Sequence, residues 1–160
     1  MRGGVLPPAL VLAALAFALA FAPRRIIWPA LGLAAAAAVV TALLTLPHGW
    51  TGAIFVVCWA TTIVAAASVH LPRGLGGRIA VLLALGAGIA AGATIAVAGT
   101  HADLARALPV ALLVWPARWL ASHKGAIAVK VAASWLVAVA ILVGTLPIVP
   151  TPGYVADHME

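Results

Sequence analysis

Residues 82–99 read LLALGAGIAAGATIAVAG, eighteen positions that include no charged side chain. At a rise of about 1.5 Å per residue, a helix of this length spans about 27 Å, close to the hydrocarbon thickness of a bilayer. Backbone groups in lipid must be satisfied within the segment, and the stretch lacks the polar alternation of a barrel strand. It therefore predicts a transmembrane helix.

The same stretch carries small residues at a spacing of four: Ala84, Gly88, Gly92 and Ala96. This pattern is typical of a helix face on which another helix packs backbone against backbone. The partner helix could belong to the same chain or to another subunit, and the run 34–38 of alanines is one candidate surface. The alternative is that an Ala-rich chain produces such a spacing by chance.

The composition of the whole chain points to the same environment. Of 160 residues, 66% are hydrophobic and 8% are charged, and the mean hydropathy is +1.21. A soluble domain would carry about a quarter charged residues. The nine Lys/Arg residues stand at the ends of apolar runs and form no basic stripe, so they indicate membrane topology and no nucleic-acid partner. The sequence predicts an all-α, polytopic integral membrane protein.

Breakers divide the chain into six apolar segments joined by short loops, at about 5–22, 26–46, 51–71, 79–99, 103–121 and 126–147. We expect them to form one transmembrane helical domain over residues 1–160. The first 22 residues resemble a signal peptide, but Pro23 directly follows the Ala-Phe-Ala ending, which disfavours cleavage. The fifth segment contains two prolines and three charges, and its alternative is to lie along the membrane interface.

Charge placement favours six spans with both termini on the non-cytoplasmic side. The loops that hold Arg24 and Arg25, the PRGLGGR turn, and Arg118 with Lys124 alternate with loops poor in Lys and Arg. If segment five spans, all these basic loops fall on the cytoplasmic side, as the positive-inside rule requires. Near the outer end of segment five, Asp103 can pair with Arg106 at a spacing of three.

Candidate binding residues are few. Trp59 and Trp135 lie inside segments three and six, each beside small polar side chains, and Lys130 is the cation nearest to them within a span. These residues predict a cavity for an aromatic or amphipathic anion. The alternative is interior packing. The other tryptophans lie near segment ends and are interpreted as interfacial anchors.

The sequence shows no equipment for catalysis, haem or metal binding. The five histidines have no H-x-x-H or His-carboxylate spacing, and the single cysteine, Cys58, forms neither an intrachain disulfide nor a thiolate metal site. There is no carboxylate in the middle of any span and no nucleophile–base pair or phosphate-cradling loop. We expect no cofactor, no metal and no enzymatic activity.

Residues 24–98 resemble the amino-terminal membrane region of the fusaric acid resistance (aromatic acid exporter) family. The stretch Arg25-Ile26-Ile27-Trp28-Pro29-Ala30-Leu31 is similar to the family's helix start, and LPHGWTGAIFVV to its LP-x-x-YWA hairpin. PRGLGGRIAVLLALGAGIAAG is similar to its basic loop and Gly-rich helix. The family is larger, with repeated membrane halves or cytoplasmic domains. The resemblance implies efflux of aromatic or amphipathic acids along a path that residues Trp28, His48, Trp50 and Arg78 could line.

Two functional hypotheses follow. The first is a bacterial inner-membrane transporter, or a transporter's membrane unit, for small aromatic or amphipathic compounds. The second is a non-catalytic structural or assembly subunit of a larger membrane complex. Either role implies the lipid bilayer as surroundings and a homo-oligomer or partner membrane subunits.

Overall fold

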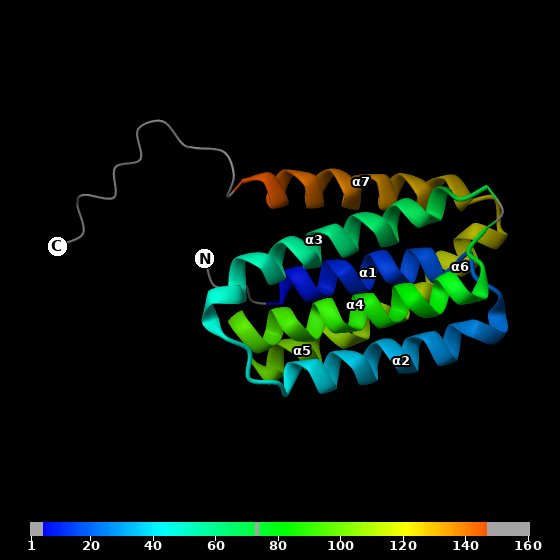
Figure 1. Ribbon diagram of the computed structural model, residues 1–160. Coiled ribbons are helices and arrows are strands. Elements are labelled where there is room, and N and C mark those ends of the chain that lie inside the picture. Colours follow the sequence, from blue (N-terminus) through cyan, green and yellow to red (C-terminus); the bar gives the residue numbers. More distant parts are fainter. Residues whose placement is uncertain (1–4, 73, 147–160) are drawn as a thin grey trace.

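The computed structural model describes residues 5–72 and 74–146, and within these ranges the chain is helical with no β-strand (Figure 1). The two termini and Arg73, and with them the predicted sidedness of Met1 and Glu160, lie outside the described residues. The α-helices are α1 (Leu6–Leu19), α2 (Arg24–Ala42), α3 (Thr51–Ala67), α4 (Gly77–Ala98), α5 (His101–Ala107), α6 (Val114–Ser122) and α7 (Ala126–Thr145). Short 3-10 turns are η1 (His48–Trp50), η2 (Ser68–His70) and η3 (Leu108–Leu113).

Five of the described helical runs are long and apolar enough to cross a membrane. They correspond to segments two to six of the sequence prediction. Segment five is one run, His101–Ser122, in which α5, η3 and α6 follow one another from one end of the bundle to the other (Figure 1). Pro109 stands in the 3-10 part, where its missing N–H costs the helix least. How many runs cross a bilayer, and in which direction, stays a prediction.

The first helix is shorter than expected. The sequence predicted a segment over residues 5–22, but α1 has 14 residues and ends at Leu19. Pro23 explains the early end, because it lacks the N–H that would bond the Leu19 carbonyl and its ring would clash with that carbonyl in a continued helix. The turn to α2 therefore begins at Ala20. At 14 residues, α1 is below the length that a straight span requires.

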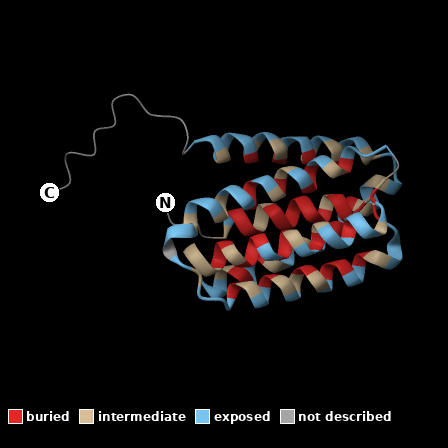
Figure 2. Ribbon diagram, viewed as in Figure 1, coloured by how far each residue is buried: buried red, intermediate tan, exposed pale blue. Residues whose placement is uncertain are grey.

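Helix α1 is nevertheless the centre of the bundle. It lies between the other helices and contacts α3, α4, α5, α6, α7 and η3. Figure 2 shows most of its length as buried, and Val11, Leu12, Leu15 and Leu19 are fully shielded. A segment that looks like a removable leader in the sequence is therefore the core around which the remaining helices pack.

Helices α2 and α4 share the most extensive contact of any helix pair among the described residues. A methyl group built on Gly88 would lie 2.9 Å from Ala37 Cβ and closer still to the Ala34 carbonyl oxygen, and Gly92 meets Ala38 and Thr41 in the same way. On this face Ala84 is fully buried and Ala96 is half-buried. The face formed by Ala84, Gly88, Gly92 and Ala96 thus packs on the alanine run 34–38 of the same chain. Of the partners considered from the sequence, it is the helix of the same chain that covers this face.

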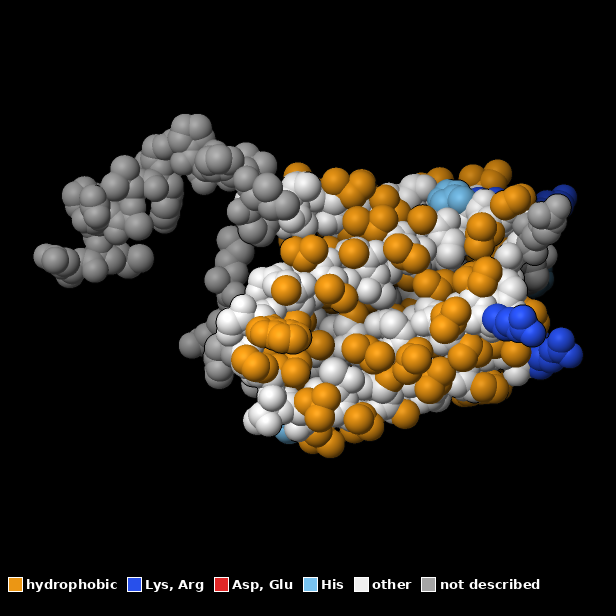
Figure 3. Space-filling model, viewed as in Figure 1, with side chains coloured by type: hydrophobic (Ala, Val, Ile, Leu, Met, Phe, Trp, Pro, Cys, Tyr) orange, Lys and Arg blue, Asp and Glu red, His pale blue; other side chains and the backbone are white. Residues whose placement is uncertain are grey.

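The two ends of the bundle differ in charge. Helix α2 begins with Arg24 and α4 carries Arg78 in its first turn, at the same end of the bundle as the α6–α7 turn (Figure 1). Figure 3 shows basic side chains gathered at this end and apolar side chains over the visible flank. We call it the basic end.

The opposite end carries the only acidic residue of the described ranges, Asp103. The predicted pair with Arg106 is confirmed, with Nη1 of Arg106 3.8 Å from Oδ1 of Asp103. The structure adds a second role: Thr100 and Asp103 form a reciprocal capping box at the start of α5.

Candidate anion-binding groove at the basic end

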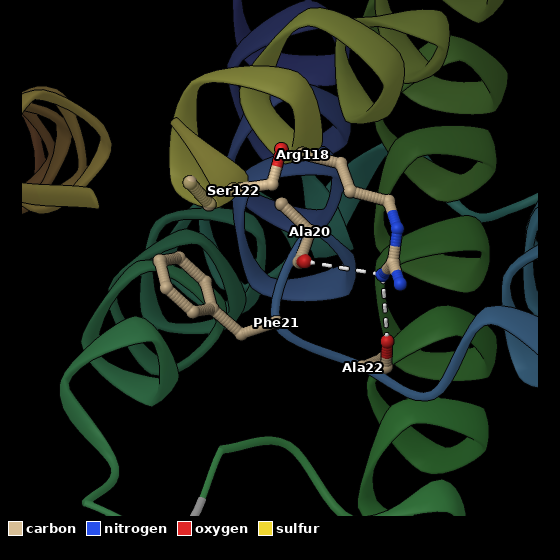
Figure 4. A pocket seen from close by; sticks show the side chains of 6 residues that line it. Ala20, Phe21, Ala22, Arg118 and Ser122 are labelled. Carbon is tan, nitrogen blue, oxygen red and sulfur yellow. Dashed lines mark hydrogen bonds between the residues drawn. The ribbon is translucent and has the colours of Figure 1, made fainter. Parts of the chain in front are cut away.

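Arg118, on α6, fastens the end of α1 to α6. Its Nη1 donates to the Ala20 carbonyl at 3.3 Å and to the Ala22 carbonyl at 2.9 Å (Figure 4). These carbonyls follow the last turn of α1, where the helix itself offers no N–H partners. The half-buried guanidinium therefore satisfies two backbone acceptors. Both hydrogen bonds use Nη1, so among the described residues Nε and Nη2 of Arg118 keep their donors.

Two surface hollows share Arg118 and Ser122. The first, about 270 Å³, lies over the α1–α2 turn and is also lined by Ala20, Phe21, Ala22 and Ala121. The second, about 380 Å³, is lined by Arg24, Trp115, Arg118, Trp119 and Ser122. We call this second hollow the basic groove.

The basic groove has an aromatic wall. Trp115 and Trp119 are four residues apart on α6 and therefore share one face of that helix. The ring of Trp28, on α2, packs on Trp115 with centroids 5.4 Å apart and planes tilted by 52°. Trp28 and Trp119 are still 63% and 61% exposed, so both indoles face the surroundings of the bundle, and Trp119 also lines the groove.

The charge of the groove is not neutralised by the described protein. Asp103 is the only carboxylate between residues 5 and 146, and it lies at the other end of the bundle, paired with Arg106. Helix α2 begins at Arg24 with no acidic residue in its first turn and no side-chain cap, so its positive dipole end adds to the field of the guanidinium groups. An anion is the ligand that this arrangement favours.

The residues predicted to line a cavity between segments three and six lie at different levels. Trp59 is buried and faces α7 near Gly144, where a built Cβ would lie 3.6 Å from Trp59 Cβ. Trp135 is nine residues from Gly144, about 13 Å along the helix axis, and is 63% exposed. Its neighbour Ser134 is level with His70, with Oγ 3.2 Å from Nε2. The structure therefore does not bring the two tryptophans together.

The other predicted binding residues are also dispersed. Lys130 is half-buried on α7 and lines neither of the two hollows, and Trp50 is 62% exposed where α3 begins, at the end opposite the basic groove. His48 belongs to η1, and its side chain lies outside what the structure describes. These residues form no shared site with Trp59 or Trp135.

Sequence reasoning missed the role of Arg118. The motif Trp115-Pro-Ala-Arg118-Trp119 places a guanidinium between two indoles, and Arg24 stands four residues before Trp28. Both patterns were explained by topology and interfacial anchoring, which the spacing alone cannot distinguish from a site. Their meeting depends on how α2 and α6 pack beside α1.

Other chemistry at the basic end is local. Ser122 Oγ lies 2.9 Å from Nδ1 of His123 and donates to the Trp119 carbonyl at 2.8 Å, and Nδ1 is 2.9 Å from the same carbonyl. This network closes the end of α6. In the described part of the chain, no three His, Cys, Asp or Glu residues come together to hold a metal ion.

An apolar helical bundle with five spanning-length runs and one basic end defines a multi-pass helical membrane protein. No family model, curated protein or solved structure matches the chain.

Proposed function

We propose that the chain is the membrane unit of a bacterial inner-membrane transporter for small aromatic or amphipathic compounds, and that anionic members of this class bind in the basic groove. The observation that carries the proposal is the groove itself. It combines two arginines, which have no carboxylate partner among residues 5–146, with two tryptophans around about 380 Å³, within the usual size range of small-molecule sites.

The chemistry of the groove fits such a ligand. The free donors of Arg118 and the exposed guanidinium of Arg24 can bind a carboxylate from two directions. The faces of Trp115 and Trp119 offer flat apolar surface to a ring. The resemblance to the aromatic acid exporter family points to the same class of compound, and assembly of several copies would supply the larger membrane unit that such exporters use.

The binding part of the proposal is tested by tryptophan fluorescence in detergent with 4-nitrobenzoate as the quencher. Quenching should saturate, and Arg24→Gln should weaken the affinity about fivefold, which corresponds to about 1 kcal/mol for an exposed charge pair. Arg25→Gln is the matched control, since Arg25 is the exposed neighbour that does not line the groove. The uncharged 4-nitrotoluene should bind with an affinity that does not depend on Arg24.

Absence of saturable quenching would refute the binding proposal. Retention of full affinity in Arg24→Gln would place the ligand elsewhere. Trp135→Leu then tests whether the ligand binds in the cavity predicted from the sequence, because this change should weaken the affinity only of a ligand that lies beside α7.

The second candidate function is a structural subunit of a larger complex. Helix α7 favours it, because α7 packs mainly on α3 and leaves large apolar side chains such as Ile127 and Trp135 exposed. The mass of the purified detergent complex separates the two functions. A partner protein at fixed stoichiometry favours the subunit role, and a homo-oligomer favours transport.

The topology prediction has its own test, in a Cys58→Ala background. A cysteine at Gly49 or at Gly76 meets no atom within 4 Å at its Cβ, so both positions accept the side chain. Gly49→Cys should react with a membrane-impermeant maleimide added to intact cells, and Gly76→Cys only after the cells are opened. The reverse pattern would invert the predicted orientation.

A further inference from the structure

We infer that the ligand of the basic groove is an anionic amphiphile that resides in the membrane leaflet at the basic end. Its oxyanion head, a phosphate or a carboxylate, binds between Arg24 and Arg118, and its apolar part lies along Trp28 and Trp115 in the hydrocarbon. This inference rests on the proposed function in one respect: it specifies the ligand of the same groove.

Along the bundle axis, the two cations of the groove lie nearer the end of the bundle than two of the aromatic rings. Arg24 is the first residue of α2, and Arg118 lies four residues before the end of α6. Both cations are therefore within about 6 Å of the bundle end, at the depth of lipid headgroups. Trp28 is one helical turn deeper than Arg24, and Trp115 is nearly one turn deeper than Arg118. Charge followed inward by apolar rings is the order of groups in an amphiphile within a leaflet.

The groove is exposed on the side of the bundle. Arg24, Trp28 and Trp119 are all exposed, although they belong to helices whose flanks are covered by apolar side chains. Helices α2 and α6 meet there through the rings of Trp28 and Trp115. A ligand that already lies in the leaflet can reach the guanidinium groups sideways, without leaving the leaflet.

The positive charge of the groove also favours an anionic lipid. A guanidinium group at a membrane surface raises the local concentration of an anionic lipid about fivefold. Two such groups meet here, with the positive end of α2 and with no carboxylate from residues 5–146. Because Arg118 is held by two backbone carbonyls, its remaining donors are fixed in direction before any ligand arrives.

The test uses a variant of the chain reconstituted in bilayers. The substitutions Trp50→Phe and Trp135→Phe remove the two exposed tryptophans that are distant from the groove. This chain is reconstituted in phosphatidylcholine with equal small fractions of either dibrominated phosphatidylglycerol or dibrominated phosphatidylcholine. Bromine quenches only tryptophans that it approaches, so quenching reports the lipid beside the groove. Salt at 0.5 M suppresses general attraction to the basic end, because screening then acts over about 4 Å.

The brominated phosphatidylglycerol should quench about twofold more strongly than the brominated phosphatidylcholine, in line with local enrichment. Arg24→Gln should abolish the excess, and Arg25→Gln should retain it. Elution and thermal unfolding of both variants should match the parent, since both side chains are exposed.

Equal quenching by the two lipids would overturn the inference, and so would an excess that both variants lose to the same degree. Failure of this inference is separable from failure of the proposed function. If 4-nitrobenzoate binds in an Arg24-dependent way while no lipid excess is seen, the groove takes its anions from water and the proposed function stands. If the lipid excess depends on Arg24 but 4-nitrobenzoate does not bind, the inference stands and the small aromatic acids are excluded as ligands.

Discussion

Gly88→Leu and Gly92→Leu are each expected to abolish the folded bundle in detergent, at a cost above about 3 kcal/mol. The reason is that α2 leaves no room at these positions. Even a single methyl group on Gly88 would lie 2.9 Å from Ala37 Cβ and closer to the Ala34 carbonyl, and Gly92 meets Ala38 and Thr41 in the same manner. Overpacking typically costs about 1–3 kcal/mol where side chains can yield. Here the obstacle is backbone, so α2 and α4 must separate.

A graded series with a matched control makes this prediction sharp. Gly86 lies two residues from Gly88 on the same helix, and a Cβ there meets nothing within 4 Å. Gly88→Ala should therefore destabilise by about 1–3 kcal/mol, whereas Gly86→Ala should stabilise by up to about 1 kcal/mol through helix propensity. Thermal unfolding followed by circular dichroism in one detergent measures both. Shifts of the same sign would mean that the close packing of α2 on α4 does not govern stability.

Leu15→Ala is expected to destabilise the chain by about 2–5 kcal/mol. Leu15 is fully buried in α1, the helix that contacts most of the others, so the lost side chain leaves a cavity that several helices would have to close. The same change at Leu82, which is 67% exposed on α4, removes only contacts at the outer surface.

The comparison of the two leucines is again made by thermal unfolding. Leu82→Ala should shift the stability by less than about 0.5 kcal/mol. If the two substitutions have equal effects, α1 is not the core of the bundle. The strong response of Leu15 would also show why this leader-like segment belongs to the folded chain.

Much of the secondary structure could be predicted because it is encoded locally. An apolar run bounded by Pro, Gly or charge must form a helix in lipid, and segments two, three, four and six were located to within a few residues. Asp103 and Arg106 were paired correctly because a spacing of three places them on one helix face. The prediction failed at the end of α1, where the apolar run continues to Ala22 but the approach to Pro23 has already turned the chain.

The candidate site was less accessible from sequence. Trp59 and Trp135 were grouped because both lie within spans beside hydroxyl side chains, but their levels depend on how α3 and α7 are aligned. In a soluble helix, the apolar stripe reveals the buried face. In this chain nearly every face is apolar, so the hydrophobic pattern cannot distinguish Leu15, which is buried, from Leu82, which is exposed.

From the amino-acid pattern alone it follows that the chain is a helical membrane protein and where most helices run, and the spacing of small residues in 79–99 predicted a face that accepts a close neighbour. These properties follow from backbone hydrogen bonding, hydropathy and residue volume, which act within a segment. The packing of the helices shows in addition that this neighbour is the alanine run of α2, that α1 is the core, and that Arg24 and Arg118 line one groove with Trp115 and Trp119. Those outcomes depend on contacts between residues distant in sequence. In a uniformly apolar chain, hydropathy does not choose between helix pairings, so the positions of small residues, which allow helices to approach closely, decide which helices pack together.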